Sequence, residues 1–104
     1  MFARVGIWHG SQEEFAQWID RSKSQVKPAV QNEPGLNAAY WLVDRASSKG
    51  MIITPWETQA AMTASEAARA ARQANMKATG ATVTTERYEV IDSLIVRRTL
   101  ATDA

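Results

Sequence analysis

The chain contains no cysteine and only one histidine, His9, among its 104 residues. The lack of cysteine excludes disulfides, thiol catalysis and thiolate metal sites, and it favours a reducing compartment. With one histidine and no close cluster of Asp and Glu, three convergent metal ligands would be hard to assemble, so we expect no metal site. The sequence also lacks a glycine-rich phosphate loop and a nucleophile elbow.

Neither sign of charge dominates the sequence, and no long apolar run is present. Twelve Lys and Arg against eleven Asp and Glu give a net charge of +1, which gives no electrostatic basis for binding nucleic acid or an anionic membrane. No apolar segment approaches the roughly 18 residues that suggest a membrane span, and the first residues lack the features of a signal peptide. We therefore expect a cytoplasmic protein without nucleic-acid or membrane partners.

What the sequence does contain is an alternation of strand-like and helix-like segments. Residue patterns predict four strands, over 2–8, 36–45, 50–57 and 81–96. Helices are expected after Ser11 and from Thr58 onward, the second ending at Gly80. This order predicts an α+β, ferredoxin-like βαββαβ fold, an antiparallel sheet with both helices on one face. We expect residues 1–96 to form a single domain and 97–104 a C-terminal tail.

Local signals refine the two helices. Ser11 and Glu14 form a capping box at the start of the first helix, and Thr63 with Glu66 offers a second box. Pro28 predicts a break in the first helix, followed by a short second piece. In the second helix, small side chains are expected to face the sheet, where they either allow close packing or leave room for a cavity: Ala67, Ala70, Ala71 and Ala74.

Both faces of the predicted sheet are apolar. Phe2 and Trp8 alternate with Val5 and Ile7 in the first strand, whereas a sheet with one solvated face should show polar residues on that face. We therefore expect a homodimer through the uncovered sheet face, because two like faces pair with two-fold symmetry. The alternative is an exposed apolar patch, which monomers rarely tolerate.

Several segments together resemble the antibiotic biosynthesis monooxygenase family of dimeric α+β barrels. They are FARVGIWHGS, VKPAVQNEPGLNAAYWLVDRASSKGMIITPWET, SEAA and ERYEV, and they cover the chain from about Met1 to Val90. The resemblance implies a dimeric α+β barrel. The superfamily includes cofactor-free monooxygenases, haem-degrading enzymes and proteins without known activity, so fold alone does not decide function.

The resemblance can be examined at the positions that carry activity in two branches of this superfamily. The haem-degrading branch uses Asn, Trp and His at positions that match Ala3, Ser65 and Asn75, so haem cleavage is not expected. The cofactor-free anthrone-type monooxygenases place a Trp at the end of the third strand, which Trp56 matches. Their polar Asn corresponds to Ile52, which cannot donate a hydrogen bond.

Five residues are candidates for a ligand site. His9 can serve as a general base, because an unperturbed imidazole titrates near about 6.5, or it can be an inert residue of the turn. Trp56 can stack on a planar ligand or pack in the core. Asn37, Tyr40 and Trp41 can line a substrate site, or serve in turns, in the core or in dimer contacts.

Two functions remain open from the sequence. The first is a cofactor-independent monooxygenase that oxidises a small aromatic or polyketide-like compound with dioxygen, with His9 as the base and Trp56 as the stacking wall. The second is a non-catalytic homodimer that binds a small hydrophobic ligand or has a structural role. Arg4 and Arg87 are expected to pair, within the sheet or across the dimer, with acidic residues of the strands: Asp44, Glu86 or Glu89.

Overall fold

The computed structural model describes residues 1–74 and 81–96, except for the side chains of residues 68 and 70–74. The strands are β1 (Phe2–His9), β2 (Tyr40–Asp44), β3 (Lys49–Trp56) and β4 (Thr82–Glu89). The helices are α1 (Gln12–Arg21), a π-helical segment η1 (Ser22–Val26), α2 (Lys27–Val30) and α3 (Gln59–Ala74). Gly80, Asn75 and the tail expected over 97–104 lie outside the described residues.

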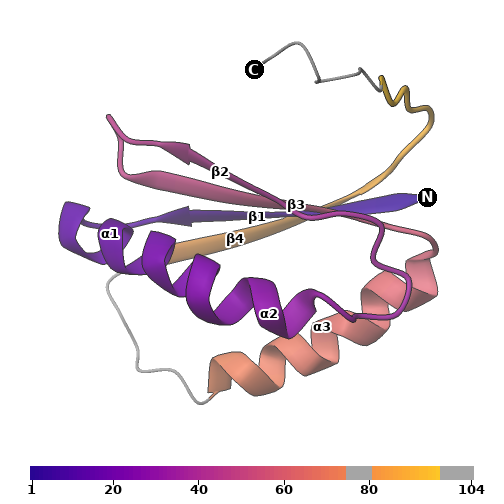
Figure 1. Cartoon of the computed structure of the whole chain (residues 1–104), viewed down its shortest axis with the longest axis horizontal. Coiled ribbons are helices and arrows are strands. Elements are labelled where there is room, and N and C mark those ends of the chain that lie inside the picture. The colour runs from indigo at the N-terminus through magenta and orange to yellow at the C-terminus, as the bar shows by residue number, and fades with distance from the viewer. Residues whose placement is uncertain (75–80, 97–104) are drawn as a thin grey trace, which may run out of the picture.

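The four strands form one antiparallel sheet in the order β2-β3-β1-β4, and the helices lie on one of its faces (Figure 1). This arrangement confirms the predicted ferredoxin-like βαββαβ fold. We call the helix-covered side of the sheet the inner face and the opposite side the outer face. Because side chains alternate along a strand, the register assigns every residue of β1 to β4 to one of these faces.

The first helix begins as the sequence predicts. The Ser11 hydroxyl accepts a hydrogen bond from the Glu14 amide at 3.2 Å, and the Glu14 carboxylate accepts one from the Ser11 amide. The break expected at Pro28 takes the form of η1, after which the coil continues as α2. Proline cannot donate to the carbonyl four residues earlier, and its ring crowds that carbonyl. The wider π turn just before it accommodates the ring.

The predictions for the second helix need two corrections. Thr58 is its cap, since the Thr58 hydroxyl accepts a hydrogen bond from the Ala61 amide at 3.1 Å, whereas Thr63 lies inside α3. The helix starts earlier because β3 ends at Trp56 and leaves only a short turn. Ala67 is exposed, and the buried side chains of α3 are Met62 and Ser65. The other three alanines expected to face the sheet have side chains outside the described set.

The strands also differ from prediction at their ends. β2 begins at Tyr40 rather than at Leu36, which forms an isolated bridge with Trp56. β4 ends at Glu89, opposite Phe2, and the Val90 amide donates to the Met1 carbonyl at 2.8 Å. The strand predicted over 81–96 is therefore too long, because the pairing of β4 with β1 ends at Glu89 and residues 90–96 belong to no strand.

The best-packed part of the core is an aromatic cluster between the sheet and α1. Trp8, Phe15 and Trp18 are buried, and the rings of Trp8 and Trp18 stack with centroids 5.7 Å apart. The outer face is apolar over its centre as well, as the sequence predicts, and no described helix covers it (Figure 1). Its apolar side chains include Val5, Ile7, Leu42, Met51 and Ile53.

Candidate functional site

The inner face has an open space in the middle of β1, at Gly6. A Cβ atom built on Gly6 would meet no atom within 4 Å in the described part of the chain. At Gly50, also on the inner face, a Cβ would overlap two ring carbons of Trp18. The sheet is therefore closely packed at one end and open at its centre. We call this opening the Gly6 space; a gap between sheet and helices is where a small ligand could bind.

One row of residues across the sheet forms the floor of the Gly6 space. Gly6 pairs with Ile52 on one side and Thr85 on the other, and Ile52 pairs in turn with Trp41. Trp41 packs against the aromatic cluster, and its buried indole Nε1 has no hydrogen-bond partner in residues 1–74 and 81–96. Leaving a buried donor unpaired costs about 1–3 kcal/mol. A ligand oxygen that reached this N–H would recover that cost.

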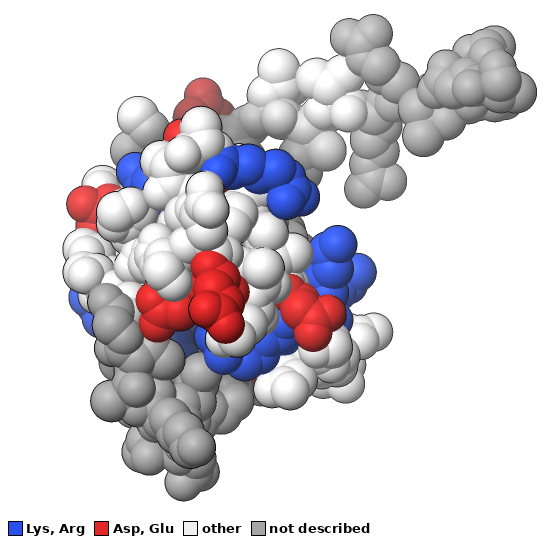
Figure 2. Space-filling view, turned by 90° about the vertical axis from the view of Figure 1, so that its left-hand side faces the viewer, with Lys and Arg blue, Asp and Glu red and all other residues white. Residues whose placement is uncertain are grey.

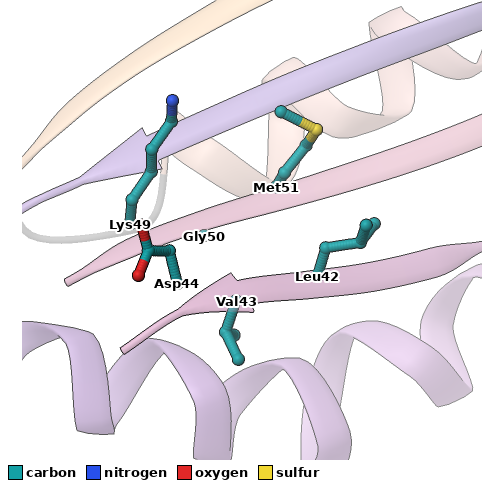
Figure 3. A pocket seen from close by; sticks show the side chains of 6 residues that line it. All are labelled: Leu42, Val43, Asp44, Lys49, Gly50 and Met51. Carbon is teal, nitrogen blue, oxygen red and sulfur yellow. The ribbon is translucent and has the colours of Figure 1, made fainter. Parts of the chain in front are cut away.

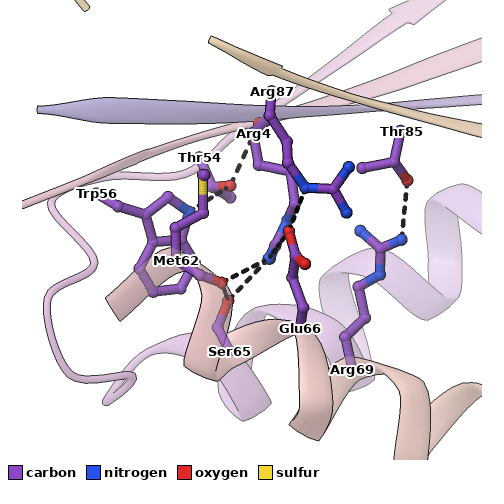
Figure 4. A network of polar contacts seen from close by, with 9 residues as sticks. All are labelled: Arg4, Thr54, Trp56, Met62, Ser65, Glu66, Arg69, Thr85 and Arg87. Carbon is purple, nitrogen blue, oxygen red and sulfur yellow. Dashed lines mark hydrogen bonds and ion pairs between the residues drawn. The ribbon is translucent and has the colours of Figure 1, made fainter. Parts of the chain in front are cut away.

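On the other side of Gly6 lies a polar network centred on Arg4 (Figure 4). The buried Arg4 guanidinium donates to the Ser65 hydroxyl at 2.7 Å and to the Met62 carbonyl at 3.3 Å. Its central carbon lies 5.2 Å from the centroid of the Trp56 ring, within the range of a cation–π contact. The contacts hold Arg4 between β1 and α3, beneath the sheet.

Glu66 forms an ion pair with Arg87 and lies near Arg4, and a third arginine, Arg69, lies close to this pair. Arg87 Nε donates to its carboxylate at 2.6 Å, Arg4 lies 3.9 Å away, and Arg69 donates to the Thr85 hydroxyl at 2.8 Å beside them. Within one protomer, these contacts of Arg4 and Arg87 are with Glu66 of α3, and the sequence analysis did not name Glu66 as their partner. Pairing of the two arginines with Asp44, Glu86 or Glu89 across a dimer stays a prediction. Arg4 and Arg87 pair in register on the inner face, which directs both side chains toward α3.

The arginines keep Glu66 ionised. The hydrogen bond from Arg87 lowers the pKa of Glu66 below its ordinary value of 4.5, and the positive charges of Arg87, Arg4 and Arg69 lower it further against the effect of burial. The same hydrogen bond raises the pKa of Arg87. Three guanidinium groups surround one carboxylate, so the edge of the Gly6 space favours an anionic group on a ligand.

Replacing Glu66 with glutamine is expected to destabilise the protein only when the carboxyl is ionised. The folded-state pKa lies below the unfolded value, so the carboxylate stabilises the fold above about pH 4.5, and this contribution is lost as the pH falls through the folded value. We expect a difference of at most about 1 kcal/mol at neutral pH, since such partly exposed pairs contribute little.

Urea unfolding of the wild type and Glu66→Gln between pH 3 and pH 7 measures this difference. Glu89→Gln, at the end of β4, is the matched control. A difference that stays constant down to pH 3 would contradict the assignment of the effect to the Glu66 charge.

The sequence-predicted site residues do not converge. Trp56 is only 1% exposed, and its indole N–H donates to the Thr54 hydroxyl at 2.9 Å, so its ring is a packed core element in this structure. Asn37 is exposed and lies near Trp56, and its backbone N–H donates to the Pro55 carbonyl. Of the five candidates, Trp41 alone belongs to the row that contains Gly6.

His9 and Tyr40 both lie on the outer face of the sheet. His9 is exposed at the end of β1, with Nε2 3.1 Å from the Ser47 carbonyl oxygen. It pairs with Lys49, whereas Trp56 pairs with Phe2 at the other end of the same two strands. Seven residues of extended chain, roughly 23 Å, separate the two ends. His9 and Trp56 therefore cannot contact one small ligand within a single protomer.

The sequence did contain a signal for the polar network that was missed. Arg4 is separated from Phe2 and from Trp8 by an even number of positions. The period of two therefore puts this charged side chain on the same, apolar face as both aromatic residues. A charge on a buried face needs a partner, and that requirement should have directed attention to the inner face. Gly6, two residues further on, shares that face.

A shallow pocket of about 220 Å³ lies at the β2–β3 hairpin (Figure 3). Its wall is formed by Leu42, Val43, Asp44, Lys49, Gly50 and Met51. Only Asp44 and Lys49 bring charge to it, and they are opposite each other in the backbone register of the hairpin. The pocket thus offers mainly apolar contact.

The described residues contain no group of side chains suited to a metal ion. Within residues 1–74 and 81–96, no three His, Asp or Glu side chains are grouped so that they could hold one. No helix in the same ranges has the length and apolar character to cross a membrane. Acidic and basic side chains are interspersed on the end of the molecule that Figure 2 shows.

Comparison with solved structures gives clear matches over nearly the whole chain. A candidate antibiotic biosynthesis monooxygenase from Deinococcus radiodurans has a TM-score of 0.67 and 18% identity, covering 94% of this chain and 100% of its own. The haem degrader MhuD from Mycobacterium tuberculosis, solved with two haems in its active site, has a TM-score of 0.68 and 20% identity, covering 90% and 99%.

SnoaB from Streptomyces nogalater, a cofactor-independent oxygenase, matches with a TM-score of 0.61 and 17% identity, covering 89% of this chain and 95% of its own. Two other matched structures, from an uncultured marine organism, are dimeric ferredoxin-like proteins. No family model and no curated protein matches the sequence. The structural neighbours are thus antibiotic biosynthesis monooxygenase-like ferredoxin-fold proteins, and this chain has their α+β fold.

Proposed function

We propose that this protein binds a small planar aromatic compound with an anionic group in the Gly6 space. The observation that carries the proposal is the opening at Gly6. The unpaired indole N–H of Trp41 lies in the same cross-strand row, and the arginines near Glu66 lie on the neighbouring part of the inner face. Aromatic walls with a few directed polar groups are typical of small-molecule sites. Trp41 would donate to a ring oxygen, and Arg69 or Arg87 would pair with the anionic group.

Filling the space should abolish binding without harming the fold. Gly6→Val adds a branched side chain where the backbone leaves room, so we expect at least a 10-fold weaker affinity and an unchanged or slightly higher unfolding midpoint. An anthraquinone carboxylate serves as the probe, with binding followed by quenching of tryptophan fluorescence. Unsubstituted anthraquinone tests the charge preference. Equal affinity of Gly6→Val and the wild type would refute the site.

We further propose that the bound compound reacts with dioxygen without a cofactor. The support is the fold shared with SnoaB. A methylene group between aromatic rings, as in an anthrone, would lose a proton to water. The resulting anion would reduce dioxygen with its electron pair to form a C–O bond, and the peroxide anion would take a proton back from water. The hydroperoxide would then release water, so that CH2 and O2 give C=O and H2O. The arginines near Glu66 would stabilise the anion.

A non-catalytic homodimer that binds a hydrophobic ligand is the second candidate. The specific observation in its favour is that His9 lies on the outer face and that the Trp56 ring is packed, so neither predicted catalytic group faces the Gly6 space. His9 remains the candidate base only for a compound bound on the outer face.

Oxygen consumption distinguishes these two functions. The wild type, His9→Ala and Gly6→Val are each incubated with a hydroxylated anthrone under oxygen. Consumption above the uncatalysed rate that Gly6→Val loses and His9→Ala keeps supports oxygenation in the Gly6 space. Consumption that His9→Ala loses and Gly6→Val keeps supports a reaction on the outer face with His9 as the base. Binding of the anthrone with no added consumption supports the non-catalytic function.

We also propose a homodimer through the outer sheet face, in the reducing environment of the cytoplasm. The outer face is apolar, and matched structures are dimeric. Sedimentation equilibrium at micromolar concentration should give twice the chain mass of 11.5 kDa. Ile53→Lys places a charge at the centre of this face and is expected to give monomers. A wild type that sediments as a monomer would refute the dimer.

A further inference from the structure

The side of the first helix that faces the sheet carries one polar residue after two aromatic ones. Phe15, Trp18 and Ser22 are all buried, and Ser22 has only 4% of its surface exposed. Residues three or four positions apart lie on one face of a helix, so Ser22 continues the stripe that Phe15 and Trp18 begin. Ser22 is also the first residue of η1, and π turns next to α-helices are frequent at functional sites.

The Ser22 hydroxyl is not used within the part of the chain that the structure describes. Two other helical serines bond back to their own helix. Ser24 Oγ donates to the Asp20 carbonyl at 2.9 Å, and Ser65 Oγ donates to the Met62 carbonyl at 2.7 Å. Among the described residues, Ser22 makes hydrogen bonds through its backbone alone. Because buried polar groups are normally hydrogen-bonded, this hydroxyl is available to a bound molecule.

The position of α1 over the sheet puts Ser22 at the level of Gly6. Trp18 lies against Gly50 of β3, and α1 and β3 both run away from the hairpin end of the sheet (Figure 1). Ser22 follows Trp18 by four residues, which is about 6 Å along a helix. Ile52 follows Gly50 by two residues, which is about 6.6 Å along a strand. Ser22 therefore lies over Ile52, which pairs with Gly6.

The floor of the Gly6 space supplies a second unpaired polar group at this level. Trp41 pairs with Ile52 on the side away from Gly6, and its buried Nε1 has no partner in the described residues. An indole N–H can only donate a hydrogen bond, and a serine hydroxyl can donate one as well. Two donors on either side of one gap match the two lone pairs of a carbonyl oxygen.

We propose that Ser22 Oγ and Trp41 Nε1 together bind a carbonyl oxygen of the ligand, and that Ser22 thereby determines specificity. This inference rests on the function proposed above. The two donors lie next to the aromatic cluster, whereas the arginines near Glu66 lie on the other side of Gly6. The site thus selects a planar compound with a carbonyl at one end and an anionic group at the other. A compound without the carbonyl leaves both donors unpaired, and sites of this kind reject such analogues strongly.

Two probes that differ only in their carbonyl groups test the selection. Anthraquinone-2-carboxylate has the carbonyls and anthracene-2-carboxylate lacks them, while the ring number and the charge are the same. In calorimetric titrations, the wild type should bind the quinone at least 10-fold more tightly. Ser22→Ala and Trp41→Phe should each bind the quinone at least 5-fold more weakly and keep their affinity for the anthracene. Ser24→Ala, whose hydroxyl bonds to its own helix, is the matched control and should behave as the wild type.

The carbonyl band of the bound quinone in the infrared gives a second readout. A hydrogen bond lowers the stretching frequency of a carbonyl group, so one band should lie lower in the complex than in an apolar solvent. Ser22→Ala should move this band back toward the value in the apolar solvent. A role of Ser22 in packing alone would leave the band in place, and an unmoved band in Ser22→Ala overturns the inference.

Failure of this inference can be told from failure of the proposed function. If neither probe binds, or if Gly6→Val binds the quinone as tightly as the wild type, the proposed function fails and the role of Ser22 fails with it. If Gly6→Val abolishes binding but Ser22→Ala discriminates between the probes as the wild type does, the site stands and only the role of Ser22 is refuted. An equal loss for both probes in Ser22→Ala assigns Ser22 to packing and also refutes that role.

Discussion

Truncating Trp56 to alanine is expected to lower the free energy of unfolding by about 3–5 kcal/mol. The side chain is 1% exposed, its N–H donates to Thr54, and its ring faces the Arg4 guanidinium at 5.2 Å. The truncation leaves a cavity and removes both polar contacts, so Arg4 loses part of the environment that holds its buried charge. A domain of this size has a total stability of about 5–15 kcal/mol, and the loss would be a large part of it.

Urea unfolding followed by circular dichroism measures the change. Trp41→Ala is the matched control, because Trp41 is also on the inner face but is only half-buried and its N–H bonds to no described residue. We expect its cost to be clearly smaller. A loss of less than about 1 kcal/mol for Trp56→Ala would mean that the Trp56 ring is available to a ligand, and the stacking role predicted from the sequence would regain support.

Replacing Gly50 with alanine should destabilise the protein by about 1–3 kcal/mol, the usual cost of overpacking. The added methyl group would overlap ring carbons of Trp18, whose ring packs against both Trp8 and Phe15 and cannot move without disturbing them. The close approach of the indole to the β3 backbone is the physical requirement for glycine at this position.

The same substitution at Gly6 is the natural control for Gly50. Both glycines lie on the inner face, but Gly6→Ala meets no described atom within 4 Å. Since glycine in a strand interior is about 0.5–1 kcal/mol less favourable than alanine, Gly6→Ala should be neutral or stabilising. Gly50→Ala should lower the denaturation midpoint, whereas Gly6→Ala should leave it unchanged or raise it. Neither variant should change the denaturant slope. A loss at Gly6 comparable to that at Gly50 would refute the opening in the inner face.

These two contrasts define the inner face as one continuous surface with two parts. The aromatic cluster fills the end near Gly50, and the network of Arg4, Glu66 and Arg87 fills the opposite end. Between them no described side chain comes within 4 Å of a Cβ built on Gly6. The proposed ligand site is thus a consequence of how two filled regions meet, and it requires no change in the backbone to admit a ligand.

Much of the architecture follows from local patterns. A period of two distinguishes strands from helices, and the capping box at Ser11 involves only residues within one turn of each other. The order of elements then leaves few topologies, and the ferredoxin-like one is confirmed. Local reasoning was less reliable at the ends of elements: it placed a cap at Thr63 and extended the last strand to Val96, because the ends are decided by what lies opposite.

The candidate site depended on contacts that no local pattern contains. Arg4 and Glu66 are separated by 61 intervening residues, and their pairing follows only from α3 lying under β1. His9 and Trp56 look like partners along the sequence, yet the antiparallel register puts them at opposite ends and on opposite faces of the sheet.

The amino-acid sequence by itself determined the strands, the helices, their order and the apolar character of both sheet faces, since these depend on neighbouring residues and on side-chain alternation. Only the tertiary structure decided which polar groups meet, that Gly6 borders an open space, and that the last strand ends at Glu89. Such features depend on packing and register between distant segments, which short-range preferences along the chain do not specify.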